Sequence, residues 1–211
     1  AYTMDRATGE LMVAEKYDPK VNWTPGVDMN KSSPTYGRPK VVAQYSTEAG
    51  GEDHNSKGIC PAALGTKDQQ PAAYSPDTGF FYVQEHNGFN LLYLTDPDPR
   101  GSMGLGGKAV ANLGSAGDFL TAIDYKTGRV AWRHPFTGGG GGGLLATAGG
   151  VLFSGDGSGN FAAFDTRDGR PLWHTRIGNI SNAPETYLID GRQHVLVAVG
   201  AGKPHGHKRE D

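Results

Sequence analysis

A nine-residue pattern that recurs at nearly regular spacing is the feature that most limits the folds open to this sequence. Residues 165–173 read DTRDGRPLW, residues 124–132 read DYKTGRVAW, and residues 5–13 read DRATGELMV. The first two share Asp, Gly and Trp, whereas Val13 replaces the tryptophan in the third. A period of about 40–45 residues with a turn glycine and a tryptophan is typical of β-propellers, which are radial arrays of four-stranded sheets.

Each residue of the pattern has a physical role in such a sheet. Glycine takes the positive-φ position of a hairpin turn, and aspartate accepts hydrogen bonds from the turn backbone. Tryptophan fills the space between neighbouring sheets. We therefore expect Trp132 and Trp173 to be buried against the neighbouring sheet, and Trp23, which lies in a polar loop, to be more exposed. Unrelated hairpins of a β-sandwich are the alternative interpretation.

The stretch around the last copy reads as one complete blade of four strands. Short apolar or alternating runs at 144–148, 151–154, 160–165 and 171–175 are separated by glycine- and aspartate-rich turns. Similar signals extend over the rest of the chain, which we expect to be one all-β domain. Its expected parts are the end of a blade (1–17), a long insertion (18–71), a blade (72–135) with an insertion (87–117), a blade (144–177), a half blade (183–200) and a solvated tail (203–211).

Twelve strands amount to about three blades, whereas closed propellers have roughly four to eight. We therefore expect the chain to be part of a larger propeller, completed by the same or a companion polypeptide. The formal charge of −2 argues against nucleic acid as a partner. No apolar run approaches the ~20 residues that a membrane-spanning helix needs, so no membrane span is expected.

The repeat resembles the tryptophan-docking motif of the quinoprotein dehydrogenases. Three other segments resemble the C-terminal part of the PQQ-dependent alcohol dehydrogenases of the methanol and ethanol dehydrogenase kind. They are GICPAALGTKDQQPAAY (58–74), LLATAGGVLFSGD (144–156) and APETYLIDGRQHVLVAVG (183–200). The resemblance implies an eight-bladed propeller of which this chain forms about three blades.

The same resemblance implies an activity for the whole protein, which is oxidation of a primary alcohol or similar substrate by hydride transfer to PQQ. It implies Ca²⁺ or a lanthanide beside the quinone, a cytochrome c or similar electron acceptor, and a periplasmic location. The catalytic aspartate and the metal ligands belong to earlier blades, so we expect none of them here. We expect this chain alone to be inactive.

Lys67 and Asp68 are the first candidate cofactor-binding residues. They precede a predicted strand, and in the resembled enzymes the position of Asp68 is commonly an asparagine that contacts the quinone. An ionised carboxylate cannot donate a hydrogen bond and would repel the carboxylates of PQQ unless Lys67 or a cation compensates. The alternative is an aspartate that caps its own turn.

Gly141, Gly142 and Gly143 are the second candidate group. In many of the resembled enzymes a tryptophan beside the cofactor occupies the position of Gly141. Glycine offers only its backbone, so contact with an anion would use N–H groups. We expect this run to form an inner edge of a blade near the propeller axis, with low-complexity drift as the alternative.

Cys60 is the only cysteine. In many of the PQQ-dependent alcohol dehydrogenases that the sequence resembles, the matching cysteine forms a disulfide with a second cysteine about thirty residues later. The position of that second cysteine corresponds to Gly88 or a residue close to it. No pattern in the sequence supplies a base that would make Cys60 a nucleophile, and we interpret it as a structural thiol. The departures at Asp68 and Gly141 leave open a second function, a non-catalytic propeller scaffold that mediates protein interactions.

Overall fold

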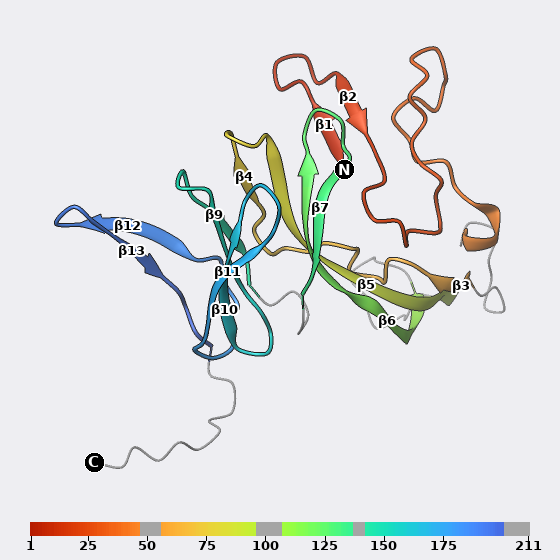
Figure 1. Cartoon of the computed structure of the whole chain (residues 1–211). Helices are drawn as coiled ribbons and strands as arrows, with labels where there is room; N and C mark the ends of the chain where they lie inside the picture. Colours follow the sequence, from red (N-terminus) through yellow and green to blue (C-terminus); the bar gives the residue numbers. More distant parts are fainter. Residues whose placement is uncertain (47–55, 96–106, 137–141, 201–211) are drawn as a thin grey trace. The chain divides into compact units, whose positions relative to one another are not determined.

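The computed structural model describes residues 1–46, 56–95, 107–136 and 142–200, and its regular structure there is almost entirely β (Figure 1). The elements in chain order are β1 (Tyr2–Met4), β2 (Leu11–Ala14), the 3₁₀ helix η1 (Ala43–Tyr45), β3 (Ser56–Ile59), β4 (Ala73–Ser75), β5 (Phe80–Thr95), β6 (Gly107–Asp124), β7 (Val130–Pro135), β8 (Leu144–Ala146), β9 (Val151–Gly155), β10 (Asn160–Asp165), β11 (Pro171–Arg176), β12 (Glu185–Ile189) and β13 (Arg192–Leu196). The predicted all-β class is confirmed.

The chain divides into two compact units, which are described separately. Unit 1 comprises Ala1–Asp68, His86–Gly117 and Asp124–Arg129, and unit 2 comprises Gln69–Glu85, Asp118–Ile123 and Val130–Asp211. Both β5 and β6 contribute residues to each unit.

Unit 2 contains a complete antiparallel sheet in which β8, β9, β10 and β11 pair in chain order. Its central turn is held by Asp156, whose Oδ1 accepts hydrogen bonds from the N–H groups of Ser158 and Asn160 at 2.9 and 2.8 Å. The turn glycine Gly159 has φ +93°, which a side chain would rarely allow. Every predicted strand of 144–177 is therefore present.

A second sheet has the order β3-β5-β6-β7, and β4 also pairs with β5. The structure differs here from the sequence expectation, because β5 runs on to Thr95 and β6 begins at Gly107. The strands were expected to stop at His86 and to resume at Asp118. The strand β3 was not predicted either, and it pairs with the distal part of β5, where Ile59 lies opposite Asn90.

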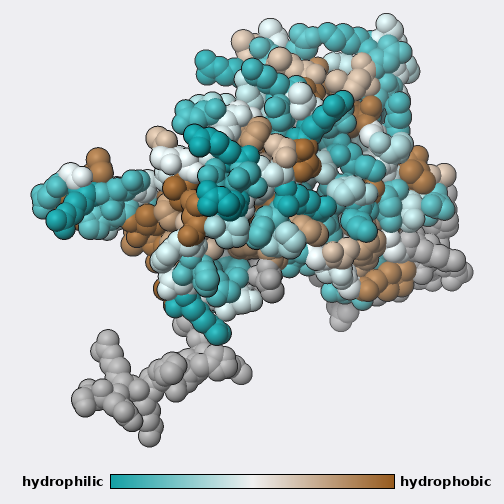
Figure 2. All heavy atoms as spheres, in the orientation of Figure 1, coloured by the Kyte–Doolittle hydropathy of each residue, from teal (hydrophilic) through white to brown (hydrophobic). Residues whose placement is uncertain are grey.

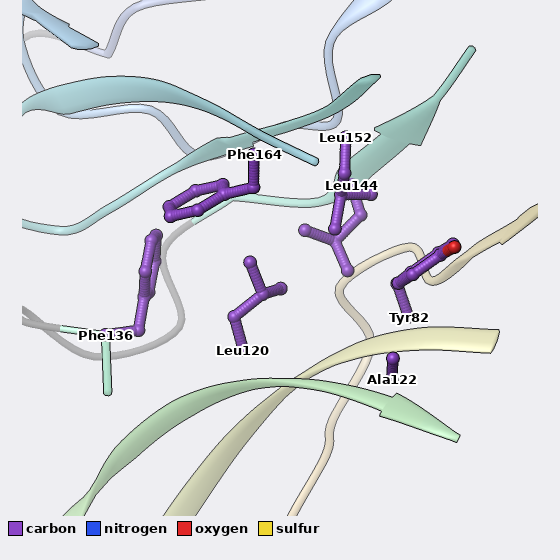
Figure 3. Packing of buried hydrophobic residues seen from close by; sticks show 7 residues of the cluster. All are labelled: Tyr82, Leu120, Ala122, Phe136, Leu144, Leu152 and Phe164. Atoms are coloured by element: carbon purple, nitrogen blue, oxygen red, sulfur yellow. The ribbon is translucent and has the colours of Figure 1, made fainter. Parts of the chain in front are cut away.

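Apolar side chains from these sheets form the core of unit 2 (Figure 3). In Figure 3 Leu120 lies between Phe136 and the pair Leu144 and Leu152, and Phe136 faces Phe164 with ring centroids 6.2 Å apart. Burial of such side chains is the main stabilising contribution to a fold of this kind. The buried members of the cluster are Tyr82, Leu120, Ala122, Phe136, Leu144, Leu152 and Phe164.

The last two strands, β12 and β13, form a hairpin whose turn is Asp190-Gly191. Both turn residues have positive φ, 49° and 75°, as expected for a tight two-residue turn. The hairpin is solvent-exposed, and hydrophobic side chains reach the surface where it leaves the β8–β11 sheet (Figure 2). Among the exposed hydrophobic residues of the hairpin, Leu188 and Ile189 lie beside its turn and Leu196 lies at its other end.

Unit 1 begins with the hairpin of β1 and β2. The following polar segment has little regular structure but is tied to the chain near Cys60 by one asparagine. The Asn22 side chain donates to Gly58 O at 2.8 Å and accepts from Cys60 N at 3.0 Å, and Asn22 N donates to Cys60 O at 3.1 Å. These hydrogen bonds satisfy the backbone carbonyl of Gly58 and both backbone polar groups of Cys60.

The three copies of the repeated pattern fold into the same turn. The N–H of its glycine donates to the carbonyl of its aspartate at Gly9, Gly128 and Gly169, over 2.8, 2.8 and 3.0 Å. The three glycines have φ between +71° and +73°. The roles predicted for Asp and Gly are therefore confirmed in each copy.

The tryptophan expectation is only partly correct. Trp132 is half-buried, but Trp173 is 50% exposed, and Trp23 is itself half-buried. Within the described residues the Trp173 ring contacts Phe161 of its own sheet, at 6.1 Å between centroids. The motif sets the position of the tryptophan on its strand, whereas its burial depends on contacts from other parts of the fold, as the difference between Trp132 and Trp173 shows.

Candidate functional site

The predicted cofactor-binding residues fall in different units. Lys67 and Asp68 belong to unit 1, whereas Gly142 and Gly143 belong to unit 2. Gly141 lies outside the described residues. Their convergence at one site therefore stays a prediction, and each group is described by itself.

The loop that carries Lys67 and Asp68 is anchored at Thr66. Thr66 is buried, its carbonyl accepts from His86 N at 2.8 Å, and its hydroxyl donates to Asp18 Oδ2 at 3.2 Å. Asp18 is itself buried, so its hydrogen bonds matter for stability. These contacts fix the backbone immediately before the two candidate side chains.

Asp68 is exposed, and Lys67 folds back over it, with Nζ donating to the Asp68 carbonyl at 2.9 Å. Among the described residues no donor lies within hydrogen-bonding distance of the Asp68 carboxylate, so turn capping does not account for it there. Lys67 brings a positive charge and Asp68 a negative one to the same short loop. The loop can therefore present either charge to a ligand.

Gly142 and Gly143 are buried where segments leading into three strands meet. An ideal Cβ on Gly143 would lie 2.6 Å from Ala183 Cβ and 2.8 Å from Pro71 Cδ. Leu144 N also donates to Pro71 O at 3.0 Å. Pro71, Gly143 and Ala183 precede β4, β8 and β12, which belong to three different sheets.

This close approach gives a physical reason for glycine at both positions. A side chain on Gly143 would require backbone to shift, and one on Gly142 would be 3.1 Å from Ile180 Cγ2. For these two residues, close packing explains the glycines better than low-complexity drift does. The same packing accounts for both glycines without requiring a bound ligand.

Cys60 has the environment of a structural thiol. It is fully buried, and burial raises its pKa to about 11, with the nearby Asp18 carboxylate adding to the effect. A thiol with a raised pKa is a poor nucleophile at neutral pH. Gly88, near the position where resembled enzymes carry the second cysteine, is tightly enclosed, since an ideal Cβ would lie 2.9 Å from Ala62 Cβ.

A buried ion pair was not anticipated from the sequence. Arg133 Nη2 on β7 lies 2.5 Å from Glu85 Oε2 on β5, and the Glu85 side chain has no solvent exposure. The guanidinium also stacks over Phe119 at 3.7 Å from the ring centroid. The sequence signal for this pair was the polar Gln84-Glu85 that follows the apolar run Phe80–Val83.

The neighbouring Gln84 links two sheets of unit 2. Its Nε2 donates to Ser154 Oγ at 2.8 Å and to Gly155 O at 3.1 Å, both on β9. Gln84 and Ser154 are both buried, so this link is a specific polar contact inside an otherwise apolar interface. It aligns β5 with β9 and needs no ligand.

In the parts of the chain that the structure describes, no three His, Cys, Asp or Glu side chains are grouped closely enough to hold a metal ion. Over the same residues, no helix has the length and apolarity that crossing a bilayer would require.

Comparison with known proteins identifies relatives over nearly the whole chain. The lanthanide-dependent methanol dehydrogenase of Methylorubrum extorquens is 48% identical over 209 residues, which are 95% of this chain and 34% of the relative. The quinoprotein ethanol dehydrogenase of Pseudomonas aeruginosa is 33% identical over 95% of this chain and 33% of its own length. This chain thus spans about a third of the length of these relatives.

A solved structure of a europium-containing methanol dehydrogenase superposes with a TM-score of 0.82 and 31% identity, over 94% of this chain and 34% of that one. Residues 116–203 also match a family model described as outer membrane protein assembly factor BamB. The first match covers both units of the chain, and the second covers only part of it. The sheets are those of a partial β-propeller, and the chain is homologous to the PQQ-dependent methanol and ethanol dehydrogenases over about one third of their length.

Proposed function

We propose that residues 1–211 form part of an enzyme that oxidises a primary alcohol or similar small substrate by hydride transfer to PQQ. The observation that carries this proposal is the 48% identity to a lanthanide-dependent methanol dehydrogenase over 95% of the chain. The TM-score of 0.82 to a europium-containing relative supports it. We extend the proposal to a Ca²⁺ or lanthanide ion, a cytochrome c or similar acceptor, and a periplasmic location.

The chain's own residues fit such a cofactor only in part. Lys67 supplies a positive charge that complements the carboxylates of PQQ, and the Asp68 carboxylate is exposed beside it. The described residues hold no cluster that would bind the cation. When bound, PQQ supplies the hydride acceptor and the ion polarises it. We assign the cation ligands and the general base to the rest of the enzyme and expect this chain alone to be inactive.

We infer that the described residues contribute a wall of the cofactor site. Gly142 and Gly143, which are closely packed just before β8, would offer backbone groups, and Lys67 and Asp68 would offer side-chain charge. An ionised Asp68 beside the cofactor carboxylates is tolerable only if Lys67 or a cation neutralises it, because an unpaired buried charge costs several kcal/mol.

A chimera tests the proposal. Residues 1–211 would replace the corresponding third of the Methylorubrum extorquens dehydrogenase, and PQQ absorbance and alcohol-dependent dye reduction would be measured with Ca²⁺ and with La³⁺. We expect a folded protein that binds PQQ and reduces dye. A chimera that folds, as judged by circular dichroism and a cooperative melt, but binds no PQQ would contradict the proposal.

Asp68→Asn in that chimera tests the predicted site residue. If charge repulsion is the obstacle, the variant binds PQQ more tightly, because an amide can donate where a carboxylate cannot. Asp77→Asn, at another exposed aspartate, is the matched control and should not change binding. Loss of PQQ affinity in Asp68→Asn alone would show that the carboxylate is a wanted ligand.

A non-catalytic scaffold is the second candidate function. The match of residues 116–203 to the BamB model supports it, although that match covers only part of the chain. The scaffold role predicts a folded chimera without PQQ binding, whereas the enzyme role predicts PQQ binding even where turnover is slow.

A further inference from the structure

A carboxylate that is distant in sequence holds the loop of Lys67 and Asp68. Asp18 is 1% exposed, and its Oδ2 accepts a hydrogen bond from the Thr66 hydroxyl at 3.2 Å. Thr66 is buried as well, and its carbonyl accepts from the N–H of His86 on β5 at 2.8 Å. Thr66 is therefore held by a side chain and by a strand backbone, and the two candidate cofactor-binding residues follow it directly.

Asp18 is in turn fixed by its own segment. Its Oδ1 accepts from Lys20 N at 2.9 Å, and its carbonyl accepts from Val21 N at 3.3 Å. One carboxylate oxygen thus serves the turn that contains Asp18, and the other serves the loop that contains Thr66. Because both residues are buried by unit 1 itself, this contact does not depend on any other part of the enzyme.

The turn at Asp18 gives no reason for a buried carboxylate. Asparagine accepts the same backbone hydrogen bond in such a turn and carries no charge, whereas moving a carboxylate out of water is costly. The amide of asparagine, however, has a single acceptor oxygen, and its nitrogen can only donate. A carboxylate is therefore the group that can accept from Lys20 N and from the Thr66 hydroxyl with two separate oxygens.

We propose that Asp18 is a positioning residue for the binding of PQQ. It holds Thr66, and through Thr66 it fixes the backbone from which the Lys67 and Asp68 side chains extend. Asp18 itself does not touch the cofactor. A loop that is ordered before binding loses less conformational entropy when the ligand arrives, so the anchor raises affinity. This inference rests on the proposed function, since it requires Lys67 and Asp68 to face PQQ.

Removing the Thr66 hydroxyl tests the anchor in the chimera described above. Thr66→Val keeps the shape of the side chain but loses the hydrogen bond to Asp18, and we expect it to weaken PQQ binding about tenfold. Thr66→Ser retains the hydroxyl and should bind PQQ within about twofold of the parent chimera. Unchanged PQQ affinity in a folded Thr66→Val chimera would overturn the proposal.

Asn22→Ala is the matched control, because it removes a different polar link of the same segment. The Asn22 side chain bonds the backbone of Gly58 and Cys60 and not the Thr66 loop. The control should lower the melting temperature and leave PQQ affinity unchanged. A loss of affinity as large as that of Thr66→Val would show that general destabilisation is the cause, and it would contradict the role of Asp18.

A change of background tests whether Asp18 acts through the loop. Asp18→Asn in the parent chimera should weaken PQQ binding, because the amide cannot accept from both donors. In a chimera that already carries Lys67→Ala and Asp68→Ala, the same substitution should have no further effect on affinity. A full additional loss in that background would show that Asp18 acts by another route and would overturn the proposal.

Hydrogen exchange at the His86 amide separates this inference from the proposed function. That N–H donates to Thr66 O, so its exchange rate reports the anchored loop without any cofactor. Thr66→Val and Asp18→Asn should each speed its exchange about tenfold relative to the Leu144 amide, which donates to Pro71 O in unit 2.

The two outcomes of this measurement have different consequences. Unchanged exchange at His86 would overturn the positioning role even in a chimera that binds PQQ. Faster exchange in a folded parent chimera that binds no PQQ would confirm the anchor but contradict the proposed function, and with it the cofactor role of Asp18.

Discussion

Trp132 and Trp173 occupy the same position of the same motif in adjacent sheets, yet their environments differ. Trp132 donates to Thr166 and lies against Gly169 of the next turn, and its ring is 5.8 Å from that of Tyr82. Trp173 is half exposed and contacts Phe161 of its own sheet. The motif places the indole on the strand, but a neighbouring turn is needed to bury it.

The comparison separates two kinds of information in the repeat. The turn is local, since Asp and Gly build it identically at Gly9, Gly128 and Gly169 whether or not a side chain covers the glycine. Docking, by which we mean the packing of a side chain from one sheet over the turn glycine of the next, is non-local because it requires that next sheet. Stability should therefore respond to a docking substitution only where the next sheet is present.

Removing each tryptophan should give the largest difference. Trp132→Ala removes an indole packed on the core and its hydrogen bond, and we expect it to lower the free energy of unfolding by about 3 kcal/mol. Trp173→Ala should cost less than about 1 kcal/mol, as surface substitutions do, because the side chain is 50% exposed. Urea unfolding followed by circular dichroism measures both values. Equal losses would show that Trp173 is buried in solution.

The turn glycines give the next largest difference. Gly169→Ala adds both positive-φ strain and a Cβ 2.5 Å from the Trp132 ring, for an expected loss of about 3 kcal/mol. Gly9→Ala has the same φ, and among the described residues no atom lies within 4 Å of an ideal Cβ there, so strain alone should cost about 1 kcal/mol. Comparing their urea midpoints isolates the docking contribution. A loss for Gly9→Ala as large as that for Gly169→Ala would mean that other atoms pack on the Gly9 turn in solution.

The distinction between local turns and non-local packing also explains which parts of the fold the sequence could predict. Alternation and turn residues predicted all twelve strands other than β3, as well as the Asp190-Gly191 turn, because those signals are local. The strand β3 was missed because its pairing with β5 is set by the extension of β5 beyond His86, where glycine and asparagine give no strand pattern. The exposure of Trp173 was missed because burial depends on contacts from distant parts of the chain, which a nine-residue motif does not encode.

In the candidate site, too, local features could be inferred from the sequence, whereas features that depend on distant residues could not. The structural role of Cys60 could be inferred from the absence of a partner base, and its buried position agrees with that inference. The tight packing of Gly143 against Pro71 and Ala183 could not be inferred, because those residues are far apart in sequence and meet only where the segments before β4, β8 and β12 pack together. The joint role of Asp68 and the glycine run stays a prediction for the same reason.

Removing a hydroxyl group that donates to a turn carbonyl should have a smaller effect on stability. Such hydroxyl groups reach the two turns whose glycine is covered by a side chain, at Gly169 and at Gly128. Tyr82 donates its hydroxyl to Thr166 O at 2.9 Å, and Thr3 donates to Tyr125 O at 2.9 Å. Tyr82→Phe and Thr3→Val should each lower the free energy of unfolding by about 1 kcal/mol, the usual net value of one hydrogen bond. Thr8→Val, at the uncovered turn, is a control that removes a hydroxyl bonded only within its own turn. A larger loss for the control than for Thr3→Val would place the stabilisation in the turn and not in docking.

The smallest expected effect concerns the protonation of the turn aspartates. The N–H of Thr8 is the main reason that the pKa of Asp5 is lowered, and the N–H of Thr127 does the same for the pKa of Asp124. Because both folded pKa values lie below the ordinary 3.8, their contribution to stability is fully present above that pH and is lost as the pH falls through the folded values. NMR titration of the two side-chain carboxyls should therefore show both pKa values lowered, although Val13 covers Gly128 and no side chain of the described part of the chain covers Gly9. If only Asp124 titrated below its ordinary range, the covering side chain and not the turn backbone would be the cause, and the separation of local turn from non-local docking would fail.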